Sequence, residues 1–151
     1  MRSIRTLGVA TAMMMCVAAL SGCKSGSPAE PTPVVIHEHK TGDDAALKTT
    51  GITLINSQEQ LAALGSETLA QMQVDFAAHS IVLVTVGEQP TGGFAATVDG
   101  VQVGGGKVYV QATVTTPSGP ATQALSHAYA LAITDKVEGE VEPEVTSNAA
   151  P

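Results

Sequence analysis

The chain contains four histidines, whose side chains suit metal binding or acid–base catalysis at neutral pH. Two of them, His37 and His39, flank Glu38. In an extended segment this spacing places both imidazoles on one side, where they could hold zinc or copper weakly. The same residues suit a polar linker, and we favour that interpretation. We therefore expect no dedicated metal site and no cofactor.

A second pattern that invites a catalytic interpretation is the pair Ser126-His127. Adjacency in sequence does not make a catalytic pair, because nucleophile and base must converge in space with a third, orienting group. The sequence also lacks the zinc-protease helix motif, the nucleophile elbow and the phosphate-binding loop. It therefore predicts a protein that is not an enzyme, with His127 at the surface where a strand begins.

The start of the chain has the features of an export signal. Two arginines precede an uncharged apolar stretch, residues 7–20, as in a secretory signal peptide. The stretch is shorter than the roughly 17–25 residues that span a bilayer. Its ending, Leu20-Ser21-Gly22-Cys23, resembles the lipobox of bacterial lipoproteins. This resemblance implies removal of residues 1–22 and lipid attachment at Cys23. An ordinary signal peptide with a coincidental cysteine is the alternative.

Charge and sorting signals narrow the partners and the location. Processing would remove both arginines and leave five of the seven basic residues against all 14 acidic ones, which changes the formal net charge from −7 to −9. Without arginine the chain has no side chain that binds phosphate through two parallel hydrogen bonds, so we expect no nucleic-acid partner. Membrane association would depend on the lipid alone. Lys24 resembles the outer-membrane pattern of lipoproteins, and we expect a lipid-anchored protein of the cell envelope on the outer membrane, facing the periplasm.

The remaining sequence divides into three parts. Residues 23–50 are rich in proline and turn formers, which predicts a lipidated N-terminus and a flexible tether. Residues 51–135 carry the apolar patterns of one globular domain. In residues 136–151, glutamates alternate with valine, glycine and proline, which predicts an acidic disordered tail. Calcium binding by these glutamates is the alternative.

The domain patterns predict an α+β fold, a small and mostly antiparallel sheet of about five strands with one or two short helices near its N-terminus. Ser57 followed by Gln60 is a capping box that opens the first helix, and residues 66–72 suit a second. The five expected strands are residues 52–55, 81–86, 94–103, 107–115 and 128–133.

Two of these strands have distinctive faces. Residues 81–86 are apolar without alternation, which is typical of a central strand buried on both faces. In residues 128–133, Tyr129, Leu131 and Ile133 share one face while the other is alanine throughout. Such an alanine face suits a closely packed neighbour, either a helix or another sheet.

The loop after the central strand is the candidate binding site. Pro90 fixes its own φ angle, while Gly92 and Gly93 permit positive φ and close backbone approach. With Thr91 and Phe94 they could offer backbone N–H groups to a carboxylate or a peptide main chain. The alternative is a tight connection in which Phe94 fills the core.

Residues 82–94, ending in Pro-Thr-Gly-Gly-Phe, resemble the segment shared by protease complex subunit PrcB family proteins. The similarity extends over residues 52–134, with Ala128-Tyr129 where the family usually has Pro-Tyr. It implies a noncatalytic accessory or binding module, a subunit of a protease complex with an envelope protease or another protein as partner.

A second similarity is limited to residues 90–94. They are similar in character to the Thr-Thr-Gly-Tyr loop that chagasin-type inhibitors of papain-like proteases present from a β-sandwich. The alternatives to an accessory subunit are therefore a protease inhibitor that presents this loop, and a weakly metal-binding envelope lipoprotein.

Overall fold

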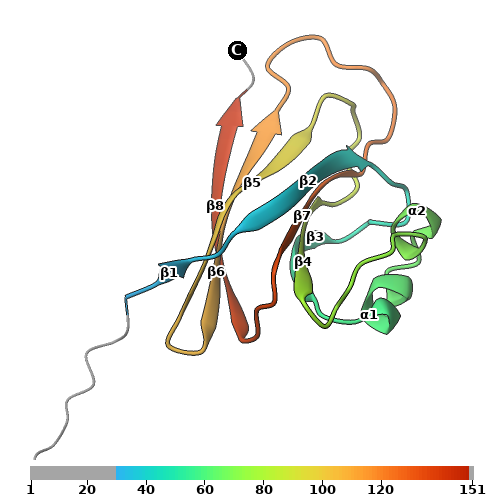
Figure 1. Cartoon of the computed structure of the whole chain (residues 1–151). Coiled ribbons are helices and arrows are strands. Elements are labelled where there is room, and N and C mark those ends of the chain that lie inside the picture. The colour runs from blue at the N-terminus through green and yellow to red at the C-terminus, as the bar shows by residue number, and fades with distance from the viewer. Residues whose placement is uncertain (1–29, 150–151) are drawn as a thin grey trace, which may run out of the picture.

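The computed structural model describes residues 30–149 as two four-stranded sheets packed face to face, with two short helices on the outer side of one sheet (Figure 1). The first sheet has the order β1-β5-β6-β8 and the second has the order β2-β7-β4-β3. The strands of the first sheet are β1 Thr32–Pro33, β5 Ala95–Gly104, β6 Lys107–Thr116 and β8 Glu140–Ala149. Those of the second are β2 Ile36–Asp43, β7 Ala128–Asp135, β4 His79–Val86 and β3 Thr50–Ile55.

The fold class therefore needs correction. The described residues form eight strands in two sheets rather than about five strands in one. All pairings are antiparallel except the parallel pair β6–β8. The domain is a mostly β sandwich, and its two helices are α1 Gln58–Ala63 and α2 Glu67–Ala70.

Serine caps start both helices where the sequence predicts them. The Ser57 side chain accepts a hydrogen bond from the N–H of Gln60, and the Gln60 side chain accepts one from the N–H of Asn56. Ser66 caps the second helix by accepting from the N–H of Leu69. Each cap satisfies an N–H group that the first helical turn leaves without a partner.

The prediction of a flexible tether up to residue 50 is wrong for its described part. Strand β2 pairs antiparallel with β7, and β1 pairs with the end of β5. The reason lies in the apolar residues that follow Pro33, because Val34 and Ile36 pack against the core between the sheets. Pro33 is tolerated because β1 is an edge strand, which need not donate on its outer side.

The prediction of a disordered acidic tail is also wrong for residues 140–149, which form β8 beside β6. The glutamates find partners on β6: Glu142 pairs with Lys107, and Glu144 accepts a hydrogen bond from Gln111. The hydrogen bond and charge of Glu142 raise the pKa of Lys107 above its ordinary value of 10.5. Val137 is buried where the chain crosses between sheets, so the tail is part of the sandwich.

The central strand β4 is buried on both faces, as its sequence predicts. Val82, Val84 and Val86 belong to the core between the sheets, while Ile81 and Leu83 face the helices. This two-sided burial explains the lack of alternation in the strand.

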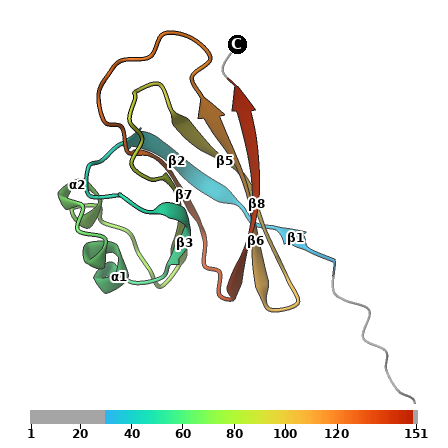
Figure 2. The same cartoon turned by 180° about the vertical axis from the view of Figure 1, so that it is seen from behind.

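Strand β7 shows what its alanine face is for. Ala128, Ala130 and Ala132 belong to the core between the two sheets, while Tyr129 and Leu131 pack on the helix side. The small side chains let the two sheets approach closely, so the neighbour of the alanine face is a sheet. Figure 2 shows both helices on the far side of the second sheet, away from β6 and β8.

The β5–β6 hairpin agrees with its sequence pattern. Its turn is formed by Gly105 and Gly106, and a β-bulge between Val98 and Gly100 interrupts the first strand near the expected position. Val108, Val110 and Ala112 are buried on one face of β6.

The predicted signal peptide, residues 1–22, and the predicted lipidation site, Cys23, lie outside the described residues. Between residues 30 and 149, no helix has the length and apolar character needed to cross a membrane.

Candidate functional site

The loop after β4 is held against a second loop, residues 117–126, which connects β6 to β7. Gln89 and Ser126 exchange two backbone hydrogen bonds, with N···O distances of 2.8 and 3.0 Å. The N–H of Gly92 donates to the carbonyl oxygen of Thr122 at 2.9 Å. We call residues 88–94 and 117–126 together the paired-loop surface. It lies at the end of the sandwich where β6 ends (Figures 1 and 2).

The two glycines of this loop lie close against the second loop, where a larger side chain would crowd it. Gly93 has φ of +91°, and a Cβ atom there would lie 3.1 Å from Cβ of Pro117. A Cβ on Gly92 would lie 3.3 Å from Oγ1 of Thr122. Within residues 30–149 no internal acceptor is described for the N–H groups of Thr91 and Gly93. Of the two glycines expected to permit positive φ, only Gly93 adopts it, and the structure adds that both lie against the second loop.

Asp43, at the end of β2, fastens the second loop to the sandwich. Its Oδ2 accepts hydrogen bonds from the Ser126 hydroxyl and from the backbone N–H of His127, both at 2.8 Å. Both donors belong to buried residues. One carboxylate therefore sets the position from which the second loop enters β7.

The surface presented to solvent is partly apolar. Pro90 and Gly93 are exposed, whereas Thr91, Gly92 and Phe94 are half-buried. In the second loop the side chain of Leu125 is 65% exposed, next to the Ser126 bridge.

Phe94 both packs against the core between the sheets and faces a hollow. The hollow has a volume of about 350 Å³ and is lined also by Gly42, Asp43 and Tyr129. Both interpretations of Phe94 made from the sequence therefore apply in part: it fills the core, and it remains within reach of a ligand.

Ser126 and His127 are not arranged as a nucleophile and its base. The Ser126 hydroxyl donates to Asp43, and Nε2 of His127 lies 3.4 Å from Oε2 of Glu88. The expectation that His127 is a surface residue is wrong, because only 5% of it is exposed. Its backbone N–H donates to Asp43, which fixes the point where the second loop enters the sandwich.

His37 and His39 do not share a side of β2, which contradicts the alternative in which these two histidines hold a metal together. A β-bulge between Ile36 and Glu38 breaks the alternation of the strand. His39 is the register partner of Ala132, whose side chain faces the other sheet. His37 instead approaches Asp135, with 2.6 Å between Nε2 and Oδ1.

Several residues of the site were missed by the sequence reasoning. Asp43 falls within the predicted tether, and no motif in the sequence marks Thr122 or Leu125 as part of a site. The apolar run Val34–Ile36 before the histidines was the available signal that this segment is a strand. No local signal in the sequence pairs the two loops.

Fold and site together define a β-sandwich module with a structured loop surface at one end. Residues 80–135, from β4 through β7, match the family model described as PrcB C-terminal. The match confirms the family resemblance over well under half of the chain, including the loop of Pro90 to Phe94, and suggests a module associated with a protease complex. No curated protein and no solved structure matches this chain.

Proposed function

We propose that this chain is a lipid-anchored protein of the bacterial cell envelope whose PrcB-like module binds another protein through the paired-loop surface. The module acts as a noncatalytic accessory subunit, and a protease complex is the assembly that the family match favours. The observation that carries the proposal is the exposure of Pro90 and Leu125 on a backbone fixed by hydrogen bonds. Apolar groups that are already ordered bind with a smaller entropic cost than groups on a mobile loop.

The position of the loops suits a protein anchored at Cys23. Strand β1, which follows the expected anchor, pairs with Gln102 and Val103 near one end of β5. The Pro90–Phe94 loop leads into the other end of β5, at Ala95. At about 3.3 Å per residue, the two ends are roughly 25 Å apart. A lipid before β1 would therefore leave the paired-loop surface on the side away from the membrane.

Affinity capture from native envelopes tests the binding role. Leu125→Asp places a charge in the middle of the proposed interface, at a side chain too exposed to support the fold. Val35→Asp is the matched control, because Val35 is 58% exposed and lies outside the paired-loop surface. We expect Leu125→Asp to lose partners that the parent and the control both retain. An unchanged set of partners with Leu125→Asp would contradict the proposal.

Protease inhibition is the second candidate function, and one observation favours it. The loop with exposed Pro90 projects from the end of a two-sheet sandwich and has a second loop beside it (Figure 1). This arrangement suits insertion into an active-site cleft. The purified chain carrying Cys23→Ser should then slow a papain-like protease at micromolar concentration, and Leu125→Asp should weaken the effect. Full protease activity across a panel of cysteine and serine proteases would exclude this function.

The lipid anchor has its own test. Cys23→Ser should move the protein from the membrane fraction to the soluble fraction and abolish labelling by radioactive palmitate. For the unmodified chain, density-gradient separation of the two membranes should place it with the outer membrane, as Lys24 predicts. Membrane association that persists in Cys23→Ser would contradict lipid anchoring at this residue.

A further inference from the structure

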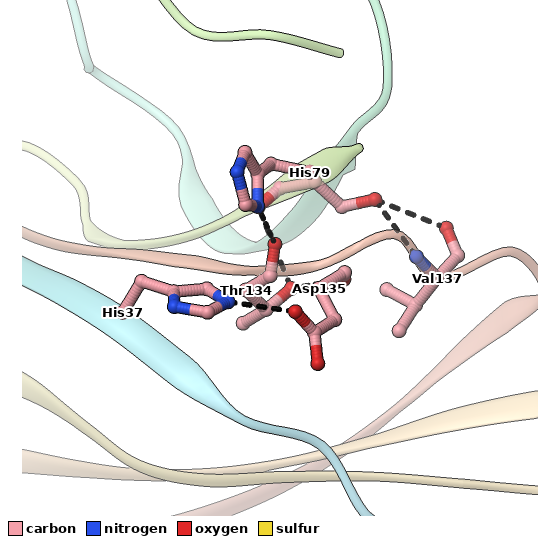
Figure 3. A network of polar contacts seen from close by, with 6 residues as sticks. His37, His79, Thr134, Asp135 and Val137 are labelled. Atoms are coloured by element: carbon pink, nitrogen blue, oxygen red, sulfur yellow. Dashed lines mark hydrogen bonds and ion pairs between the residues drawn. The ribbon is translucent and has the colours of Figure 1, made fainter. Parts of the chain in front are cut away.

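Away from the paired-loop surface, His37, His79 and Asp135 bring three potential metal ligands together (Figure 3). One ring nitrogen from each histidine and one carboxylate oxygen all lie within 4.8 Å of one another. The ring centroids of the histidines are 5.0 Å apart, with an angle of 70° between the ring planes. Nε2 of His37 is already 2.6 Å from Oδ1 of Asp135.

The backbone of three strands fixes this arrangement. His79 and Asp135 are register partners across β4 and β7, so their side chains project from the same face of the second sheet. His37 comes from β2, at the bulge between Ile36 and Glu38. A bulge redirects a side chain out of the regular alternation. Nδ1 of His79 lies 3.3 Å from the carbonyl oxygen of Thr134, which holds the ring beside the pair (Figure 3).

The surroundings favour a cation. His37 and His79 line a hollow of about 300 Å³ whose wall also includes Glu38 and Asp75. Two lysines close to these residues in sequence, Lys40 and Lys136, have other partners. Lys40 pairs with Glu38 at 3.1 Å, and Nζ of Lys136 donates to the carbonyl oxygens of Asn56 and Phe76. The side chains of His37 and Asp135 are 43% and 55% exposed, so an ion could enter from solvent.

We propose that His37, His79 and Asp135 bind one divalent transition-metal ion of the zinc type. Two imidazoles and one carboxylate are a zinc donor set, and three protein ligands leave a fourth position open. With metal–ligand bonds of about 2.0–2.1 Å, ligand atoms around tetrahedral zinc are about 3.3 Å apart. The His37–Asp135 pair must therefore open slightly and His79 must close in, by rotation of side chains that are not fully buried. The metal would replace the direct contact between Nε2 of His37 and Oδ1 of Asp135.

Bound metal would join three strands of the second sheet. It would connect edge strand β2 to β7 and to the start of the central strand β4. An ion that binds this arrangement and not the unfolded chain raises the unfolding temperature. Zinc should therefore stabilise the protein as well as bind to it.

Calorimetric titration with Zn²⁺ tests the site in the full chain. Cys16→Ser and Cys23→Ser in the background remove thiols that also bind zinc. The test variants are His37→Asn, His79→Gln and Asp135→Asn. The control is His39→Asn, an exposed histidine on the same strand outside the cluster. We expect one Zn²⁺ per parent chain and a loss of affinity of at least about tenfold in each test variant, the low end of what loss of even an outer-shell partner costs.

Thermal unfolding with and without Zn²⁺ supplies an independent readout. The parent and His39→Asn should both melt at higher temperature with Zn²⁺, and the three test variants should not. Because His37 and Asp135 are exposed, the variants His37→Asn and Asp135→Asn should keep the fold. Zinc binding by either of these variants therefore tests the site without interference from unfolding. Absence of zinc binding by the parent overturns the site. So does parent-like affinity in His37→Asn or Asp135→Asn, or equal loss in His39→Asn.

Discussion

Asp43→Ala should destabilise the whole domain, although its position has the composition of a linker. The substitution removes two hydrogen bonds from a carboxylate, each 2.8 Å long, and leaves the buried Ser126 hydroxyl without that acceptor. Hydrogen bonds to charged groups contribute about 1.5–3 kcal/mol each, and solvent around exposed Asp43 reduces that contribution. We therefore expect the free energy of unfolding to fall by about 2–3 kcal/mol in total.

Equilibrium unfolding in urea measures this change. For a slope of about 2 kcal/mol per molar urea, the midpoint should fall by roughly 1 M. Asp43→Asn keeps one acceptor oxygen and should lose less. Glu38→Ala is the control on the same strand: Glu38 pairs with Lys40 on the surface, and such pairs contribute up to about 1 kcal/mol. If Asp43→Ala unfolds at the same urea concentration as the parent, β2 does not hold the second loop and the reasoning fails.

Three further predictions concern packing, loop geometry and charge. Ala130→Leu should force the two sheets apart and cost about 1–3 kcal/mol of unfolding free energy, measured in urea, because Ala130 is 1% exposed between them. Gly93→Val should lower the free energy of unfolding by about 1–3 kcal/mol and speed proteolysis of the paired loops, because position 93 combines positive φ with contact to the second loop. The control Gly119→Ala has free space around its Cβ and should change neither stability nor proteolysis. The stabilisation that Lys107 gains from Glu142 is complete below pH 10.5 and is lost as pH rises through the raised pKa of Lys107. The melting temperature of the parent should therefore fall as Lys107 loses its proton, and in a pH series Lys107→Met should lack this part of the fall.

The elements that the sequence predicts are those with local signals. Both helices begin at serine caps, and β4 to β7 carry apolar residues in the period of a strand or in an unbroken run. The spacing of apolar residues in each of these elements reflects which of its own faces are buried. A reader of the sequence can therefore find them without knowing the neighbouring strands.

The missed strands β1, β2 and β8 are all edge strands, and most of their residues are exposed. Their composition is that of a linker, with proline, glutamate and histidine. What orders them is a partner strand from a distant part of the chain: β7 for β2, and β6 for β8. No local pattern specifies such a partner, and the bulge that separates His37 from His39 is equally invisible in the sequence.

Strand β2 connects the two candidate sites of the domain. At its end Asp43 holds the second loop of the paired-loop surface, and at its start His37 reaches Asp135. Detachment of β2 would therefore disrupt both sites, whereas Zn²⁺ at His37 would strengthen the attachment that Asp43 also needs. This relates Asp43→Ala to the metal: if the substitution lets β2 detach, the variant should lose more stability with Zn²⁺ present than without it, because a detached β2 cannot hold the ion and the variant then gains less from Zn²⁺ than the parent does. Equal losses in both conditions would mean that the two ends of β2 attach independently.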